Sequence, residues 1–207
     1  MTASWYDRHI LPWALDIACG LRAVERQRRK VVPLAHGRVL EVGIGTGLNM
    51  AWYDPVRVSR ITGLDPALDL HPRAQRRIEA AGLPVELVGL SAEQIPRPDA
   101  SFDTVVMTYT LCTIPDPVAA LREMRRVLVP GGRLLFCEHG RAPDASVARW
   151  QDRLQPLWGP LAGGCHLNRD IHALLQAGGF ACPDLQTRYL PGPRVMTFNY
   201  WGQALAA

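Results

Sequence analysis

The chain has 207 residues, enough for one well-packed α/β domain and short for two at roughly 100 to 200 residues per domain. Hydrophobic residues make up 48% and charged residues 20%, which excludes intrinsic disorder and fibrous repeats. The formal net charge is only +4, so nucleic acid is not favoured as a partner. The five cysteines are odd in number and form no CxxC pair, which favours a reducing, cytoplasmic setting.

The N-terminal region predicts one amphipathic helix. From Ile10 onward apolar residues recur at three- and four-residue steps, and the pattern ends near Lys30. Arginines gather in the last turns of this helix, and we interpret them as its solvated end because no aromatic residues interleave with them. No apolar run approaches the about 18 residues of a membrane span, and no signal-peptide pattern opens the chain. We therefore expect no stable membrane insertion.

The rest of the chain alternates between predicted strands and helices. Strands are predicted where short aliphatic runs occur, at 38–42, 60–64, 85–88, 102–108 and 133–138. Helices are predicted at 47–53, 68–81, 116–129, 144–158 and 168–177. Two alternating segments, 182–189 and 194–201, flank Pro191-Gly192-Pro193 and predict a hairpin. The pattern indicates a Rossmann-like, doubly wound α/β fold: a seven-stranded sheet, mostly parallel, with one antiparallel strand near the C-terminus and helices on both faces.

A glycine-rich turn follows the first predicted strand. Residues 39–47 read Val-Leu-Glu-Val-Gly-Ile-Gly-Thr-Gly, and the alternate glycines allow a tight bend and close approach of a flat ligand. The GxGxG spacing differs from the GxGxxG of pyrophosphate-binding folds, and no Gly-Lys-Ser/Thr follows as in a phosphate-binding P-loop. Asp65 ends the next predicted strand, where its carboxylate can accept hydrogen bonds from both hydroxyls of a ribose. Together they predict a nucleoside site.

A third element, Ser91-Ala92-Glu93, follows the third predicted strand. The combination resembles the class I S-adenosylmethionine-dependent methyltransferases from Val39 to about Gly179. The resemblance implies S-adenosylmethionine as donor and S-adenosylhomocysteine as product, with adenine read by the loop after the third strand. Many relatives carry aspartate where Ser91 stands, so the backbone of Ala92 and the carboxylate of Glu93 are the alternatives for that contact. The donor-binding residues implied are Tyr6, Glu41, Gly43, Ile44, Gly45, Thr46, Gly47, Asp65, Pro66, Ser91, Ala92, Glu93 and Thr108.

Further stretches resemble a branch of that superfamily that includes alkyl thiol S-methyltransferases. These stretches are 109–114, 121–132, 136–139 and 164–169. Quinone C-methyltransferases and phospholipid N-methyltransferases share the Arg-Val-Leu-x-Pro-Gly-Gly sequence of 126–132 but less of the others. Membrane-bound thiol methyltransferases carry an apolar anchor, which we do not find in this sequence. The expected acceptor is therefore a small thiol-bearing metabolite, with quinone or phospholipid methylation as the alternative and a non-catalytic donor-binding module as a different class.

The chemistry asks little of the protein. Methyl transfer from a sulfonium is an in-line displacement that needs alignment, exclusion of water and at most removal of a proton, so no metal is predicted. The candidate catalytic residues are His139, the first candidate base at the end of the fifth strand, its neighbour Glu138, and His166 as a second candidate base. Cys112 and Cys165 are interpreted as small buried hydrophobes, and Cys165-His166 alone lacks the further ligands that a metal site needs. Asp103 is expected to be structural.

Acceptor-side residues are implied by the same resemblance. The predicted substrate contacts are Trp5, His9, Tyr109, Cys112, Trp158 and Cys165. Packing of aromatic residues against the domain is an equally good reading of Trp5, Tyr6 and His9. We divide the predicted single domain, 1–207, into an N-terminal helical lid (1–37), a donor-binding core (38–140), a helical acceptor-side segment (141–178) and a C-terminal hairpin (179–207). The sequence leaves the oligomeric state open.

Overall fold

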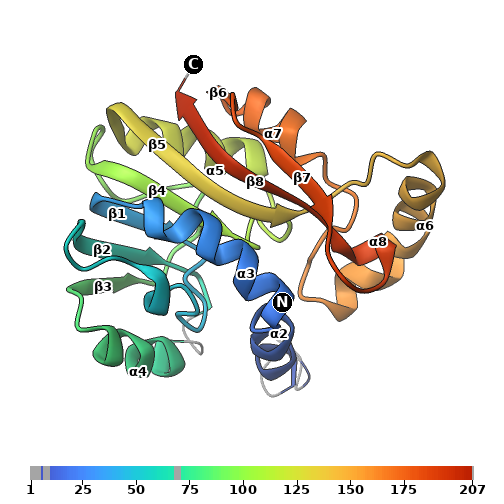
Figure 1. Ribbon diagram of the computed structural model, residues 1–207, viewed down its shortest axis with the longest axis horizontal. Coiled ribbons are helices and arrows are strands. Elements are labelled where there is room, and N and C mark those ends of the chain that lie inside the picture. The colour runs from blue at the N-terminus through green and yellow to red at the C-terminus, as the bar shows by residue number, and fades with distance from the viewer. Residues whose placement is uncertain (1–5, 7–9, 68–70, 207) are drawn as a thin grey trace.

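A computed structural model describes residues 6, 10–67 and 71–206, which build one continuous eight-stranded sheet (Figure 1). The strand order is β3-β2-β1-β4-β5-β8-β6, and β7 pairs separately with β8. The strands are β1 (Gly37–Val42), β2 (Val58–Leu64), β3 (Val85–Val88), β4 (Phe102–Thr108), β5 (Leu128–His139), β6 (Phe180–Ala181), β7 (Gln186–Tyr189) and β8 (Phe198–Ala206). Neighbours among β1 to β5 pair in parallel, whereas β8 is antiparallel to its three partners. The predicted Rossmann-like sheet is confirmed; the strand count exceeds seven because β6 and β7 both pair with β8.

Helices cover both faces of this sheet. They are α2 (Leu11–Cys19), α3 (Arg22–Val31), α4 (His71–Ala81), α5 (Pro117–Val127), α6 (Ala145–Leu161), α7 (Ile171–Ala177) and α8 (Arg194–Thr197), with 3-10 turns η1 (Val32–Leu34) and η2 (Met50–Trp52). Successive residues of β4 point to opposite faces, as a pleated strand requires. Val105 and Met107 pack with α5 and α7, whereas Val106 packs with α3 and α4. Each face therefore has its own hydrophobic core.

The first predicted helix is wrong in one respect, because the chain breaks it in two. The backbone N–H of Gly20 closes α2 onto the carbonyls of Asp16 and Ile17, and Leu21 then adopts an extended conformation with ψ of 140°. Glycine is unfavourable inside a helix, so the break falls where the helical conformation is weakest. The break separates α3, which contacts β5 and β8, from α2, which lies below it in Figure 1.

The helix predicted at 47–53 is also wrong, since this stretch forms turns and the short η2 instead. Gly47 has φ of +78°, in the left-handed region that helices exclude. The Asn49 side chain is fully engaged in buried hydrogen bonds described below, and these tertiary contacts override local helical periodicity. Smaller differences concern ends: α6 continues through Pro156 and Pro160, and the hairpin before β8 contains the short helix α8.

Two helices expose large apolar side chains. On α2, Trp13 and Ile17 are 59% and 48% exposed, and on α6, Leu157 and Leu161 are 69% and 61% exposed. The two helical regions touch, because the Tyr6 hydroxyl donates a hydrogen bond of 2.9 Å to the Leu161 carbonyl. Among the described residues, none of the helices combines the length and apolar character needed to cross a bilayer.

Candidate active site

The glycine loop lies where the strand order reverses, between β1 and β4. Open α/β sheets bind ligands at the carboxyl ends of the strands at this point. The N–H of Gly43 donates a 2.7 Å hydrogen bond to the Leu64 carbonyl at the end of β2. Gly43 has φ of +71°, and a Cβ there would overlap the side chain of Thr110. Only glycine therefore lets the loop after β1 touch the loop after β4.

Asp65 holds this loop from the neighbouring strand. Its carboxylate is buried, and Oδ2 accepts a 2.9 Å hydrogen bond from the Gly45 N–H while Oδ1 accepts one of 2.8 Å from Ala67. An ionised carboxylate accepts about four hydrogen bonds, so these two backbone contacts are compatible with further donors such as ribose hydroxyls. The predicted Pro66 follows at an exposed position.

Helix α2 rests on the far end of the glycine loop. The Thr46 hydroxyl donates a short hydrogen bond to the Asp16 carboxylate of α2. Arg77 of α4 donates to the same carboxylate at 3.0 Å and to the Thr46 carbonyl at 2.7 Å. Burial opposes ionisation of Asp16, but these hydrogen bonds and the two nearby arginines lower its pKa overall. An ionised Asp16 thus joins the N-terminal helix α2 to the loop. On the inner side of the loop, the buried Ile44 side chain packs against Gly63.

A buried polar network lies beneath the loop. Glu41 of β1 accepts hydrogen bonds from Asn49 Nδ2 at 2.9 Å and from the Tyr53 hydroxyl at 2.8 Å. Asn49 Nδ2 also lies 3.0 Å from Thr108 Oγ1, and Arg28 of α3 donates to both Asn49 Oδ1, at 2.9 Å, and the Thr108 hydroxyl. Burial raises the pKa of Glu41 to about 7, although its two hydrogen bonds oppose the rise. Glu41 and Thr108, both predicted to bind S-adenosylmethionine, thus belong to the network that fixes the shape of the loop.

Arg28 is a site residue that the sequence analysis assigned to a solvated helix end. It is only 5% exposed, and its guanidinium lies over the ring of Tyr109, 5.2 Å from the centroid. A signal exists in the sequence: Arg28 falls four residues after Val24 and three before Val31, so it shares the inward face of α3. A charged residue on a buried helix face indicates a polar partner, here Thr108 and Asn49.

The loop after β3 connects to α5. Ser91 is exposed and its hydroxyl donates to the Glu93 carboxylate, which also accepts a 3.2 Å hydrogen bond from the N–H of Asp116. Ala92 is buried. Ser91 and Glu93 line a surface cleft with Leu90, Gln94, Ile95, Pro96, Asp116, Ala119 and Glu123. The predicted adenine-reading segment therefore borders a cleft, and Glu93 already ties its two walls together.

Asp103 is structural, as the sequence predicts. Its carboxylate accepts hydrogen bonds from the backbone N–H and the guanidinium of Arg38, at 2.7 to 3.0 Å. Those hydrogen bonds lower the pKa of Asp103. This pair joins β4 to β1 at the end of the sheet opposite the glycine loop.

The loop after β4 is shaped by Glu138 of β5. Glu138 Oε1 accepts hydrogen bonds from the N–H groups of Thr110, at 2.8 Å, and Leu111, at 3.2 Å. Its side chain is fully buried, and burial raises its pKa to about 7 against the effect of these two hydrogen bonds. Tyr109 has φ of +56° and its hydroxyl donates a 2.6 Å hydrogen bond to Asn199 of β8. Glu138 thus positions the loop that carries the next group of candidates.

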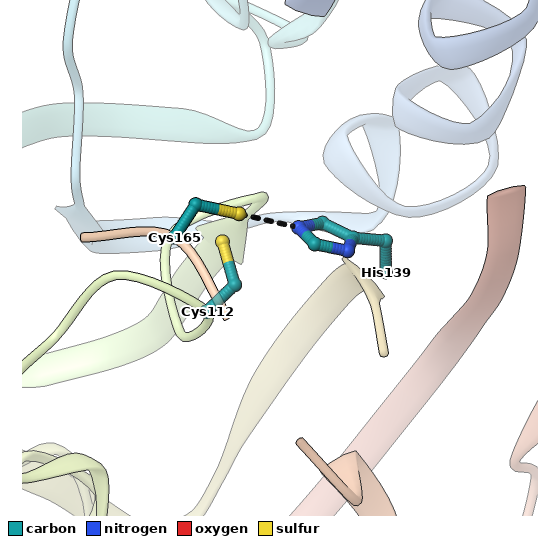
Figure 2. Close-up of side chains that lie close together, drawn as sticks. All are labelled: Cys112, His139 and Cys165. Atoms are coloured by element: carbon teal, nitrogen blue, oxygen red, sulfur yellow. Dashed lines mark hydrogen bonds between the residues drawn. The ribbon is translucent and has the colours of Figure 1, made fainter. Parts of the chain in front are cut away.

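Cys112, His139 and Cys165 come together beside this loop (Figure 2). His139 ends β5, Cys112 lies between β4 and α5, and Cys165 lies between α6 and α7. His139 Nε2 lies 3.2 Å from Cys165 Sγ, and the donor atoms of all three residues are within 4.8 Å of one another. Burial disfavours a charged His139, but the contact with Cys165 outweighs it and raises the pKa of the imidazole. The neighbouring Cys112 and burial raise the pKa of Cys165.

The other predicted acceptor-side residues surround this cluster. The Cys112 carbonyl oxygen accepts a 2.9 Å hydrogen bond from the backbone N–H of His166 and lies 3.0 Å from His166 Nδ1. Trp158 of α6 packs against Cys112 and Cys165. Arg169, which the sequence analysis did not select, donates from Nη1 to the carbonyls of Leu111 and Ile114, the latter at 2.8 Å. Its only sequence signal is membership of the 164–169 stretch.

Two predicted N-terminal contacts, Trp5 and His9, lie outside the described residues. Tyr6 is described, and its hydroxyl is hydrogen-bonded to the Leu161 carbonyl of α6.

The strand order, the glycine loop at the reversal point and the buried acid after β2 define a protein of the Rossmann-like fold class with a candidate ligand site where the strand order reverses. Comparison with known proteins narrows this class. A family model described as a methyltransferase domain matches residues 40–136. The chain belongs to the class I S-adenosylmethionine-dependent methyltransferases.

Curated relatives differ in the acceptor their names give. Thiol S-methyltransferase TMT1B of Rattus norvegicus is 33% identical over 75% of this chain, which spans 64% of that protein. Phosphatidylethanolamine N-methyltransferase of Cereibacter sphaeroides is 37% identical over 66% of this chain and 70% of its own. Demethylmenaquinone methyltransferase of Thermus thermophilus is 32% identical over 77% of this chain and 74% of its own. The comparison establishes the family and leaves several acceptor classes.

Solved structures agree on the fold. One from Thermotoga maritima, described as an S-adenosylmethionine-dependent methyltransferase and possible histamine N-methyltransferase, superposes with a TM-score of 0.67. It covers 98% of each chain at 21% identity, so the similarity concerns the fold alone.

Proposed function

We propose that this chain transfers the methyl group of S-adenosylmethionine to the sulfur of a small, apolar thiol. The observation that supports this acceptor most directly is His139, an imidazole at the carboxyl end of β5 with two thiols around it. A thiol with an ordinary pKa of about 8.5 has to lose one proton, and an imidazole can accept it. The 33% identity to a thiol S-methyltransferase agrees with this assignment.

The donor is proposed to bind along the glycine loop. The Asp65 carboxylate accepts hydrogen bonds from the ribose hydroxyls, and the segment 91–93 contacts adenine at the cleft beside α5. The backbone of Gly43 to Gly47 borders the methionine part, and the buried network of Glu41, Asn49 and Arg28 keeps that backbone in place. Rigid backbone support matters because displacement needs the methyl carbon aligned with the attacking atom.

The reaction is an in-line displacement. The acceptor sulfur forms a bond to the methyl carbon while the bond from that carbon to the sulfonium sulfur breaks, which leaves neutral S-adenosylhomocysteine. The thiol proton leaves the acceptor before or during attack, and His139 is the group proposed to promote that loss. The thiolate is the reactive form, and a positive charge near the acceptor sulfur increases the fraction of thiolate.

The surroundings suit an apolar acceptor. Trp158 packs on the cysteines, and α2 and α6 expose Trp13, Leu157 and Leu161 on adjoining helical segments. Exposed apolar patches on soluble domains mark binding surfaces, and a hydrophobic acceptor would gain about 25 cal/mol for each Å² of apolar surface it buries.

A direct assay tests the proposal. The purified chain is incubated with methyl-labelled donor and, in parallel, with an alkyl thiol, a demethylated quinol and phosphatidylethanolamine vesicles. We expect label on the sulfur of the thiol and its loss in Asp65→Ala. Label only on the lipid amine or on the quinol ring carbon would refute the thiol as acceptor and would still identify the chain as an active methyltransferase.

Phosphatidylethanolamine is the second candidate acceptor. The 37% identity to a phosphatidylethanolamine N-methyltransferase and the exposed apolar residues of α2 and α6 favour it. An amine acceptor also has to lose a proton, so His139 would keep its role. The vesicle arm of the assay separates the two.

A further inference from the structure

Three soft donor atoms from three separate parts of the chain face one another at the acceptor side of the sheet. Cys112 follows β4, His139 ends β5 and Cys165 precedes α7. Figure 2 shows both sulfur atoms and a ring nitrogen of His139 turned toward a common point. Two of the atoms, Cys165 Sγ and His139 Nε2, are 3.2 Å apart, and all three lie within 4.8 Å.

The loops that carry these residues are held independently of the cluster. His166 ties the Cys165 loop to the Cys112 carbonyl through two contacts, and Arg169 donates to two carbonyls of the Cys112 loop. Glu138 fixes the first residues of that loop through Thr110 and Leu111. Such supporting hydrogen bonds are what orients ligands around a metal ion before it binds.

The chemistry of the donor set selects the ion. In tetrahedral zinc sites the metal lies about 2.3 Å from thiolate sulfur and about 2.0 to 2.1 Å from imidazole nitrogen, which separates the ligand atoms by about 3.5 to 3.8 Å. Cys165 Sγ and His139 Nε2, at 3.2 Å, are slightly closer than this, and each of the other two pairs of ligand atoms is separated by no more than 4.8 Å. Soft thiolates with imidazole favour Zn²⁺ over hard cations, and three protein ligands with one open position is the arrangement of catalytic zinc.

We propose that Cys112, His139 and Cys165 bind one Zn²⁺ ion whose fourth position is open. On binding, each thiol releases its proton to solvent and His139 coordinates through Nε2 as neutral imidazole. Two thiolates balance the charge of the ion, so the buried site stays electrically neutral. Within the part of the chain that the structure describes, these three side chains form the one cluster of His, Cys, Asp or Glu residues close enough to share a metal ion.

The loop that carries Cys112 adjoins the glycine loop. Thr110, two residues before Cys112, packs directly over Gly43. With the ion bound, His139 is its ligand and the ion takes over promotion of proton loss: it would bind the acceptor thiol as its thiolate, since coordination to zinc deprotonates a thiol. The thiol proton goes to solvent, the sulfur takes the methyl group, and the resulting thioether, a weaker ligand, leaves. This last role rests on the proposed function; the ion site does not.

Metal binding is measured on the reduced, chelator-treated full chain with a phosphine reductant. We expect one Zn²⁺ per chain after dialysis, by elemental analysis. We also expect Co²⁺ to give the intense thiolate-to-metal absorption of a tetrahedral site. Cys112→Ser, Cys165→Ser and His139→Ala should each weaken uptake, and the double cysteine variant should abolish it. Cys182→Ser, a half-buried cysteine near the end of the sheet, is the matched control and should bind one ion.

Several outcomes would overturn the site. These are no uptake by the reduced wild-type chain, equal uptake by the double cysteine variant with intact circular dichroism, or a Cys112–Cys165 disulfide that reduction converts to thiols without metal uptake.

The role in acceptor binding is tested separately. An alkyl thiol added to the Co²⁺ form should shift its absorption bands, and an unchanged spectrum would refute the open position. Full thiol methylation by metal-free protein would refute the role of the ion and leave the proposed function standing. Metal uptake without thiol methylation would leave the ion site standing and refute the proposed function together with the role of the ion that depends on it.

Discussion

The donor side and the acceptor side of the sheet edge are built on different principles. On the donor side, the Asp65 carboxylate accepts a hydrogen bond from the Gly45 N–H of the glycine loop, and Asn49 donates to the Glu41 and Thr108 side chains beneath that loop. On the acceptor side, side-chain atoms of Cys112, His139 and Cys165 converge from loops far apart in the chain. The first arrangement depends on the conformation of one segment and the second on the packing of several. Substitutions should therefore separate donor binding from transfer chemistry.

The largest effect is expected from His139→Ala. Loss of the imidazole should lower methyl transfer to a thiol by about 10²- to 10⁴-fold, because it removes the group proposed to take the thiol proton and, in the metal-bound chain, a ligand of the ion that deprotonates the thiol. Affinity for S-adenosylmethionine should change little because His139 is on the acceptor side. Initial rates with labelled donor and calorimetric donor titration give the two quantities. A parallel loss of donor affinity would mean that the two sides are not independent.

Arg28→Met should destabilise the fold. The substitution leaves Asn49 Oδ1 without its buried donor and removes one of the two donors to the Thr108 hydroxyl, and loss of a partner costs about 1 to 3 kcal/mol for a buried polar group left unsatisfied. Urea unfolding gives the free energy. The control is the neighbouring Arg29→Met, whose exposed ion pair with Glu25 contributes about 0.2 to 1 kcal/mol. Equal effects would show that the Arg28 network does not support the loop.

Asp65→Ala should weaken donor binding by about 10- to 100-fold, since hydrogen bonds to a charged group are worth about 1.5 to 3 kcal/mol. Asp65→Asn should lose less because it retains one acceptor oxygen. Donor affinity by calorimetry checks both, and unchanged affinity in the alanine variant would place the ribose elsewhere.

The buried carboxyl groups predict a pH dependence. Glu41 and Glu138 have pKa values raised to about 7 by burial. The pKa of a glutamate in the unfolded chain is about 4.3. Between that pH and pH 7 the folded chain therefore keeps these two protons, whereas the unfolded chain releases them. Both groups therefore lower the free energy of unfolding as pH rises toward 7, by at most about 1.4 kcal/mol per unit each.

Glu138→Gln removes one of these titrations while its side-chain oxygen can still accept from Thr110. Its unfolding free energy should fall less steeply from pH 5 to 7 than that of the wild type. The exposed Glu79→Gln on α4 is the control and should follow the wild type. A Glu138→Gln slope as steep as the wild type's would contradict a proton on buried Glu138.

The smallest effect is expected from Tyr6→Phe. It removes the hydrogen bond to the Leu161 carbonyl, worth about 0.5 to 1.5 kcal/mol. Because this contact joins the N-terminal segment to α6, protease cleavage before Leu11 should become faster while the midpoint of global unfolding barely moves. An unchanged cleavage rate would show that the contact does not hold the segment.

The same contrast explains what the sequence could predict. Gly43 and Asp65 directly follow strands, and the buried strand 102–108 is visible as an apolar run, so local patterns are sufficient to predict the glycine loop, the acid after β2 and the sheet. The helix break at Gly20 follows from the low helical propensity of glycine, whereas the missing helix at 47–53 depends on contacts with distant residues such as Thr108. Periodicity carries no information about such contacts.

The acceptor side was only partly predictable. His139 could be placed on the rim because it ends a strand, and the structure puts it at the end of β5. Its approach to Cys112 and Cys165 follows from how α6 and α7 fold back, which no short-range spacing encodes. Arg28 was missed because a cluster of arginines looks like a solvated surface unless one of them is known to face inward.

The pairing of β8 has a consequence for biosynthesis. His139 lies opposite Asn199, Asn199 accepts the Tyr109 hydroxyl, and the N–H of Gly140 donates to the Phe198 carbonyl. The strand that braces this rim of the sheet is thus supplied by residues 198–206, which leave the ribosome after every other described element. A nascent chain can order its glycine loop early, but it acquires a braced rim around His139 only when these last residues emerge.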